Sequence, residues 1–202
     1  MQTGLFFNRK YDVLMITFDS IEFTSDQKDS DYILIYNKNN LLIGINILNF
    51  SKKIKCKIFE GINNDNSILF HELKPLLREK INFNCDFNLD FQYVVGYIEN
   101  TKPHPQSSKL KICKVEFNDK KHNIVCGAAN VKEKQLVVVA TINSWLHTEL
   151  QIKPSQLLGI ESNGMICSGG ELGIEQKYLG IKILDNKIYK LNDSFWGKYY
   201  GL

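Results

Sequence analysis

The sequence has few arginines, no C-x-x-C pair and no long apolar run. Its two arginines are Arg9 and Arg78, so nearly all positive charge is carried by lysine point charges rather than by planar guanidinium groups. The longest apolar stretches, such as Leu41 to Leu48, are too short to span a bilayer. The five cysteines are an odd number, and no secretory signal precedes them. We therefore expect reduced thiols and a cytoplasmic location.

The excess of positive charge is small and unevenly spread. The 25 basic and 22 acidic side chains give a net charge of +3, which is low for a protein that coats nucleic acid by bulk charge. Residues 1–88 carry eleven charges of each sign, whereas residues 89–202 carry fourteen basic and eleven acidic. The excess is densest between Asn100 and Lys134, where eight lysines face three acids. A local positive surface there could hold phosphates, although a solvated lysine face explains the charge alone more simply.

Residues 1–88 are predicted to form an α+β domain. Three β-rich runs and one helical run are recognised, at Tyr11–Phe18, Asp31–Tyr36, Leu41–Leu48 and Ile68–Ile81. The polar stretch Thr24–Ser30 is expected to be a loop, and the Asn-rich turn at 37–40 predicts a hairpin. Pro75 is expected to kink or interrupt the helix.

Beyond a polar linker at 82–90, the pattern changes to short strands separated by turns. Within Lys109–Phe117 the parity of the apolar residues switches between Ile112 and Cys113, which predicts a β-bulge and a curled strand. Further strands are predicted at 93–98, 122–126, 136–140 and 164–167. Short strands with little helix signal predict a small closed all-β barrel.

Three clusters in this half occur in a specific order. They are His104-Pro-Gln-Ser-Ser-Lys-Leu110, Ile124-Val-Cys-Gly-Ala-Ala-Asn-Val131, and Gly159-Ile-Glu-Ser-Asn-Gly-Met-Ile-Cys-Ser168 followed by Glu171-Leu-Gly173. Together they resemble the EMAP-type tRNA-binding domain, over about residues 90–200. A separate domain before it resembles the layout of free-standing YtpR-type bacterial tRNA-binding proteins, and the domain itself is similar to the N-terminal domain of the phenylalanyl-tRNA synthetase β subunit.

The resemblance implies a fold, a function and two domains. The expected fold is an α+β N-terminal domain of unknown function at 1–88, followed by an all-β OB-fold barrel at 90–200 that binds tRNA. The implied function is non-catalytic, with no cofactor and no metal. The expected partner is tRNA, held by shape and phosphate contacts on a lysine-lined face. DNA and membranes are not expected as partners.

Six side chains are candidates for contact with RNA: His104, Lys109, Lys111, Asn130, Ser162 and Met165. Lys109 and Lys111 alternate along one strand, so both point to the same face and can neutralise phosphates if that face lies outside the core. The resemblance places Ser162 and Met165 in an RNA-contacting turn, with a hydroxyl for phosphate or 2′-hydroxyl and a thioether for a base.

Some of these residues also have a structural explanation, which is weakest for Lys109. His104 can organise its loop, Met165 fits core and surface equally, and Cys126 and Cys167 fit barrel core better than a ligand set.

Two departures from the family pattern bear on binding. Ser107-Ser108 replaces an Ala-Asp pair, and Leu158 occupies a place that is often basic. Lysine contacts without arginine predict modest affinity and steep salt dependence.

Catalytic motifs are weak in this sequence. There is no phosphate-binding Walker loop and no dinucleotide fingerprint, and His122 and Cys126 are too far apart along a strand to pair by local geometry. The alternative function is a protein–protein adaptor or dimerisation module associated with an aminoacyl-tRNA synthetase. Residues 176–202, with an aromatic end, are the candidate surface for a homodimer, or they pack against the chain's own first domain.

Overall fold

The computed structural model describes residues 2–19, 23–84, 87–148, 150–175 and 180–202. The chain divides into two compact units, Met1–Asp90 and Phe91–Leu202, and each is described by itself. No helix in these ranges has both the length and the apolar character needed to cross a membrane.

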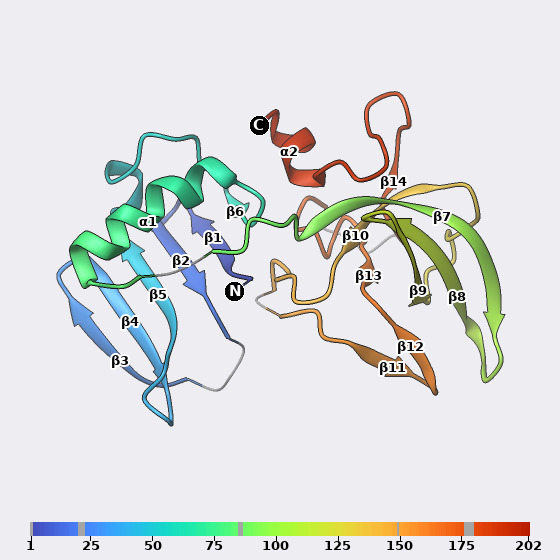
Figure 1. Ribbon diagram of the computed structural model, residues 1–202, viewed down its shortest axis with the longest axis horizontal. Coiled ribbons are helices and arrows are strands. Elements are labelled where there is room, and N and C mark those ends of the chain that lie inside the picture. Colours follow the sequence, from blue (N-terminus) through green and yellow to red (C-terminus); the bar gives the residue numbers. More distant parts are fainter. Residues whose placement is uncertain (1, 20–22, 85–86, 149, 176–179) are drawn as a thin grey trace. The chain divides into compact units, whose positions relative to one another are not determined.

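The first unit is built on one six-stranded antiparallel sheet with the strand order β3-β4-β5-β2-β1-β6 (Figure 1). Its strands are β1 (Gly4–Asn8), β2 (Val13–Thr17), β3 (Phe23–Asp29), β4 (Tyr32–Asn37), β5 (Leu42–Leu48) and β6 (Gly61–Ile62). A short 3₁₀ helix, η1 (Phe50–Lys52), follows β5, and the α-helix α1 (Ser67–Ile81) follows β6. The hairpin predicted around the Asn-rich turn is β4–β5.

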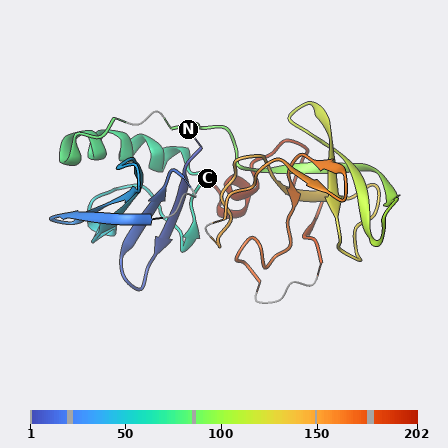
Figure 2. The ribbon, with the colours of Figure 1, turned by 90° about the horizontal axis from the view of Figure 1, so that it is seen from below.

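Helix α1 lies over one face of this sheet (Figure 2). Leu69, Leu73 and Leu77 recur at helical spacing and are fully buried in a core that includes Leu5 and Ile45 of the sheet. The helix begins at the N-cap Asn66, whose side chain accepts the Leu69 N–H at 3.1 Å. It runs on through Pro75 to Ile81, so the expected interruption at Pro75 is wrong.

The expected α+β character of the first domain is also wrong, because six strands accompany this single long helix among the described residues. The predicted loop at 24–30 is mostly β3, an edge strand whose side chains are all exposed. A strand buried on neither face shows no apolar alternation, and this is why the polar run was mistaken for a loop.

Nearly all of the regular secondary structure described in the second unit is β-strand. Its main sheet has the order β13-β10-β7-β8-β9, with β14 paired to β10. These strands are β7 (Tyr93–His104), β8 (Ser107–Phe117), β9 (Lys120–Cys126), β10 (Leu136–Ala140), β13 (Met165–Ile166) and β14 (Ile183–Leu184). A separate hairpin joins β11 (Ser155–Leu157) to β12 (Ile160–Ser162), and the helix α2 (Phe195–Tyr200) follows near the C-terminus.

The expected OB-fold barrel is wrong, because the sheet does not close. No strand ladder joins β9 to β13 within the described ranges, so the two ends of the sheet stay unpaired. Only isolated hydrogen bonds link β9 to the β12–β13 region, such as Asn163 N–H to the Asn123 carbonyl at 2.9 Å. The predicted bulge between Ile112 and Cys113 is wrong, because the register of β8 is unbroken at this point. The register between β7 and β8 shifts elsewhere, between Ile98 and Asn100 and again between Pro103 and His104.

The C-terminal aromatic residues pack within the second unit. Trp196 of α2 is 2% exposed, and its ring centroid lies 5.8 Å from that of Tyr93 in β7. Tyr199 remains 47% exposed. Of the segment 176–202 that was considered for a homodimer, residues 176–179 lie outside the described residues.

Candidate nucleic-acid interface

The outer face of β7, β8 and β9 carries exposed lysines in a regular pattern. Cys113, Val115 and Phe117 of β8 are buried in the core, so Ile112, Lys114 and Glu116 point to the opposite face. On that face the exposed Lys114 is flanked by its pairing partners Asn100 and Asn123, which are exposed as well.

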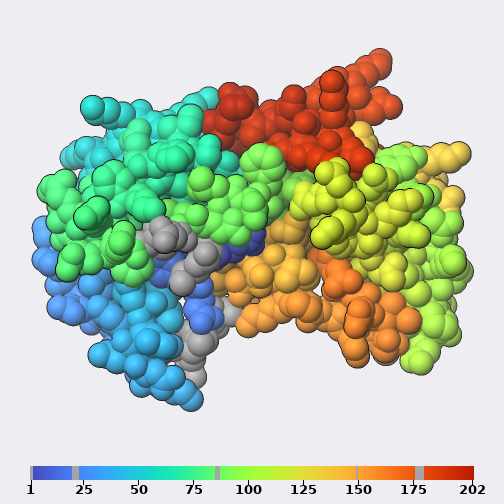
Figure 3. Space-filling view, viewed as in Figure 1, coloured from blue at the N-terminus to red at the C-terminus, as the bar shows by residue number. Residues whose placement is uncertain are grey.

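Two more lysines extend this surface. Lys102 of β7 pairs with Ile112, and Lys121 of β9 pairs with Glu116, so both share the outward side with Lys114. We call Lys102, Lys114 and Lys121, together with Asn100 and Asn123, the lysine face. In the space-filling view, the yellow-green surface around β8 and β9 adjoins the orange surface around β11 and β12 (Figure 3).

Most lysines of this segment form no ion pair with a described residue. Lys121 pairs with Glu99 at 2.6 Å; the hydrogen bond between them lowers the pKa of Glu99 and raises the pKa of Lys121. Six exposed lysines form no ion pair with any described residue: Lys102, Lys109, Lys114, Lys120, Lys132 and Lys134. The surface is therefore locally positive although the whole chain is almost neutral.

The two lysines predicted on β8 have different surroundings. Lys109 is exposed near the β7–β8 turn. Lys111 is half-buried, shares the inward side with Cys113, and donates from Nζ to the Val131 carbonyl at 2.9 Å. Lys111 thus caps a loop carbonyl, and only Lys109 of the two presents a free ammonium group.

His104 occupies a structural position at the end of β7. It is 4% exposed. Its Nδ1 accepts the Gln106 N–H at 3.1 Å, so Nε2 carries the proton and donates to the Leu157 carbonyl at 3.0 Å. Both ring nitrogens are occupied within the protein, and we therefore leave His104 out of the surface proposed to contact RNA.

Asn130 and Ser162 also direct their hydrogen bonds inward. The Asn130 amide donates to the Ile181 carbonyl and accepts the Ile181 N–H, each at 2.9 Å. Ser162 is 3% exposed, and its hydroxyl accepts the Val125 N–H at 3.1 Å and donates to the Gly164 carbonyl at 3.2 Å. These two side chains join separate segments of the unit.

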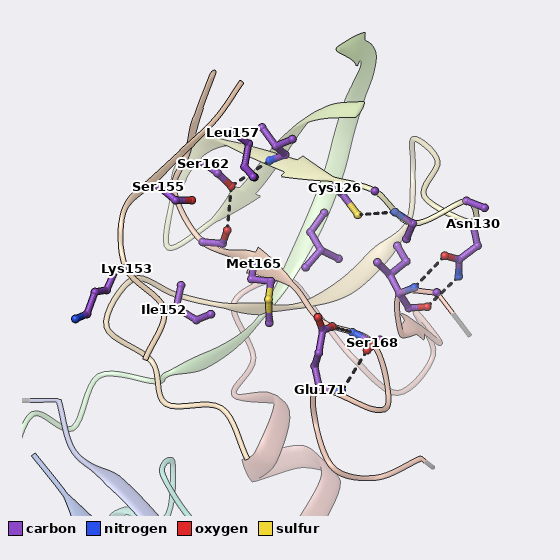
Figure 4. Close-up of a pocket in the computed structure, with 18 of the residues that line it drawn as sticks. Cys126, Asn130, Ile152, Lys153, Ser155, Leu157, Ser162, Met165, Ser168 and Glu171 are labelled. Atoms are coloured by element: carbon purple, nitrogen blue, oxygen red, sulfur yellow. Dashed lines mark hydrogen bonds between the residues drawn. The ribbon is translucent and has the colours of Figure 1, made fainter. Parts of the chain in front are cut away.

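Met165 lies in a groove of about 860 Å³ between the end of β9 and residues 151–166 (Figure 4). Ile152 and Leu157 also line the groove, and Ser155 and Lys153 lie at its exposed side. At the other side, the carboxylate of Glu171 accepts the Ser168 N–H at 2.6 Å. The groove therefore has an apolar wall with polar groups around it, and this combination suits a ligand that contains a flat ring.

Sequence reasoning missed Lys102, Lys114, Asn100 and Asn123. The signal was present, because Lys114 lies between the apolar residues Cys113 and Val115 and must point away from them. None of these four residues belongs to the three motif clusters, at 104–110, 124–131 and 159–173.

Thiol chemistry has little support in the geometry. The His122 ring stacks on Phe117, with 4.0 Å between centroids, and His122 and Cys126 pair with different residues of β8, Val115 and Lys111. Burial raises the pKa of the Cys126 thiol. The free cysteines in the described part are Cys56, Cys113, Cys126 and Cys167, and Cys85 lies outside it.

Comparison with known proteins finds a family model and a relative that matches most of the chain. Residues 93–189 match the family model described as "Putative tRNA binding domain". Over 189 residues the chain is 31% identical to the "Putative tRNA-binding protein YtpR" of Bacillus subtilis, covering 91% of this chain and 94% of that protein.

Two further matches each cover less than half of this chain. The chain is 50% identical over 94 residues to the phenylalanine–tRNA ligase β subunit of Prochlorococcus marinus, which is 46% of this chain and 11% of the subunit. The chain thus spans about a tenth of the synthetase subunits it matches. A crystal structure of the C-terminal domain of Plasmodium vivax p43 is 25% identical with a TM-score of 0.31, covering 38% of this chain and 45% of that one.

Proposed function

This chain belongs to the family of tRNA-binding-domain proteins that includes YtpR, and from that premise we propose that it is a non-catalytic protein that binds tRNA through the lysine face and Lys109. The observation that carries the proposal is the set of six exposed lysines between residues 100 and 134 that form no ion pair with any residue the structure describes. Uncompensated lysines neutralise phosphates and release counterions, which is the main source of affinity in binding that reads no sequence.

The spacing of the lysine face suits a phosphate backbone. Lys102 pairs with Ile112, and Lys114 is two residues further along β8, so the two lysines are diagonal neighbours roughly 7–8 Å apart. Both ammonium groups can therefore reach one short stretch of backbone. Asn100 and Asn123 beside Lys114 add amide donors for phosphate or 2′-hydroxyl oxygens.

The test is the salt dependence of binding to bulk tRNA by the full chain. For wild type, the logarithm of the binding constant should fall linearly with the logarithm of the salt concentration. In the double variant Lys102→Ala/Lys114→Ala, the slope should become shallower by about 2, because each lost phosphate contact removes about one. The charge-matched control is Lys38→Ala/Lys187→Ala, which removes one exposed lysine from each unit outside the lysine face.

Two outcomes would contradict the proposal. If wild type binds no tRNA at low salt, the function itself is wrong. If wild type binds but the double variant keeps the wild-type slope, tRNA is held elsewhere. The single variant Lys109→Ala should make the slope shallower by about 1. Lys111→Ala should chiefly lower the stability of the protein, because Lys111 donates a hydrogen bond to the Val131 carbonyl.

The matches to synthetase β subunits favour a second proposal, that the chain associates with an aminoacyl-tRNA synthetase. A pull-down with the tagged full chain, with and without ribonuclease, tests it. Recovery of a synthetase after ribonuclease treatment supports a direct protein contact, and its loss shows that tRNA bridges the two proteins.

A further inference from the structure

The tip of the β11–β12 hairpin has an unusual residue for its turn. Leu157 pairs with Ile160, so the loop consists of Leu158 and Gly159 alone. Their φ values are +48° and +81°, the two positive values of a type I′ turn. Any Cβ crowds the following carbonyl oxygen in this conformation, and the first position favours Asn or Asp because their short polar side chains offset that cost by hydrogen bonding locally.

Leu158 stands apart from the other residues in this conformation. Eleven described residues other than glycine have positive φ, and eight of them are Asn or Asp. The remaining three are Ser30, Lys134 and Leu158, so Leu158 is the apolar one. The matching turn between β8 and β9 uses Asn118 and Asp119.

Packing within the chain does not compensate for this choice. The Leu158 side chain is 51% exposed and Leu157 is 40% exposed. Every residue of β11 is exposed as well. A leucine in a strained conformation with half of its surface exposed gains little packing from the fold, which points to a contact outside the chain.

The surroundings of the tip indicate what it contacts. The His104 imidazole holds the Leu157 carbonyl at 3.0 Å and so fixes the tip to the end of β7 (Figure 1). Pro105 and Lys109 of the β7–β8 hairpin are exposed, and Lys109 has no ion pair with a described residue. Leu157 also lines the groove that holds Met165. An apolar tip beside an uncompensated cation fits a ligand that combines a flat apolar face with negative charge.

We propose that Leu158 and Leu157 form an apolar contact for an unstacked nucleobase of the bound RNA. This inference rests on the proposed function, and it names the part of the RNA that the tip meets. Loops of a folded RNA offer such bases, and they are recognised by stacking or apolar contact rather than by charge.

The test is Leu158→Asn in the full chain. Asparagine followed by Gly159 is the favoured pair for this turn, so the hairpin should be at least as stable as in wild type. Binding to bulk tRNA should weaken about fivefold at every salt concentration between about 50 and 200 mM, as expected for losing part of one buried leucine. Since no charge is lost, the salt slope should equal that of wild type. The matched control is Leu150→Asn, which removes another exposed leucine, 64% exposed, from the same unit.

A second pair of RNAs distinguishes binding to the bases from binding to the phosphate backbone. Poly(U) has unstacked bases, whereas a poly(A)·poly(U) duplex keeps its bases stacked inside and has the same kind of backbone charge. Leu158→Asn should weaken binding to poly(U) about fivefold and leave binding to the duplex unchanged.

The outcomes distinguish this inference from the proposed function. If wild type binds no tRNA, both fail. If wild type binds tRNA and Leu158→Asn binds equally well, or if Leu150→Asn weakens binding as much, the nucleobase contact is wrong and the proposed function stands. Sedimentation could instead show that wild type is a dimer and that Leu158→Asn is a monomer with unchanged tRNA affinity. The tip would then be a protein–protein contact, and the inference would be overturned.

Discussion

The Nε2 atom of His104 lies 3.0 Å from the carbonyl oxygen of Leu157, and this hydrogen bond joins two hairpins that are 53 residues apart in the sequence. The same ring accepts the Gln106 N–H through Nδ1 at 3.1 Å. We expect His104→Ala to lower the free energy of unfolding of the second unit by about 2–4 kcal/mol, because it opens a cavity and leaves a carbonyl and an N–H without their partner. The two tryptophans of the chain, Trp145 and Trp196, are both buried in this unit, so urea unfolding followed by tryptophan fluorescence measures the effect.

Gln106→Ala is the control, since Gln106 joins this network through its main chain and its loss should change stability little. An unfolding free energy of His104→Ala equal to that of wild type would show that the two hairpins are held together by other contacts.

Gly180 is expected to tolerate no side chain. A Cβ atom there would overlap Asn130 Oδ1, and φ is +98°. Gly180→Ala should therefore lower stability by about 2–4 kcal/mol, through backbone strain and displacement of the Asn130 amide from Ile181. The control is Gly159→Ala, which has φ of +81° but no atom within 4 Å of the added Cβ, and it should cost about 1–2 kcal/mol. Equal losses in the two variants, measured by tryptophan fluorescence, would mean that the contact with Asn130 has no part in the effect.

Cys113 should make the second unit less stable in alkaline solution. Burial raises the pKa of its thiol from the ordinary 9.0 to about 12, so the folded state keeps a proton that the unfolded chain loses above pH 9. Stability should fall as pH rises from 9 towards 12, and in Cys113→Ala this decline should be shallower by about 1.4 kcal/mol per pH unit.

Tryptophan-monitored urea unfolding between pH about 8 and about 10.5 provides the comparison with wild type. Cys56→Ala serves as the control, because Cys56 belongs to the first unit, which contains no tryptophan. Parallel pH profiles of wild type and Cys113→Ala would be evidence against the raised pKa.

Replacing Pro75 should increase the stability of the first unit. It lies exposed in the middle of α1, where it supplies no N–H to the helix. Pro75→Ala should stabilise the first unit by about 1–3 kcal/mol, because alanine restores the missing hydrogen bond and has the highest helix propensity. Thermal unfolding followed by far-UV circular dichroism measures the gain, with Arg78→Ala as a control on the same helix. A lower melting temperature would imply that the proline ring is itself part of the packing.

The elements with one buried face were predictable from the sequence. Strand β10 was predicted at its observed bounds, Leu136–Ala140, and the α1 prediction was one residue short. Strand β3 was missed because all its side chains are exposed. Barrel closure depends on pairing between β9 and β13, which are far apart in the chain, and no local pattern reports whether such a ladder forms.

The candidate site was less predictable than the fold, because the motif identifies polar residues without showing where their hydrogen bonds go. His104, Asn130 and Ser162 have polar side chains that could meet RNA, yet each satisfies main-chain groups of another segment. Lys102 and Lys114 lie outside the recognisable clusters, and only the strand register brings them to one face.

The inward hydrogen bonds of Asn130 have a consequence for protein engineering. The Asn130 amide both donates to and accepts from Ile181, as a peptide group of a neighbouring strand would. The motif residue therefore stabilises the fold, and the fold does not depend on it to fix the side chains on the outer surface of β7–β9. A library could randomise the outward positions of that surface, retain the motif, and select variants for other polyanions, with the native chain as its starting template.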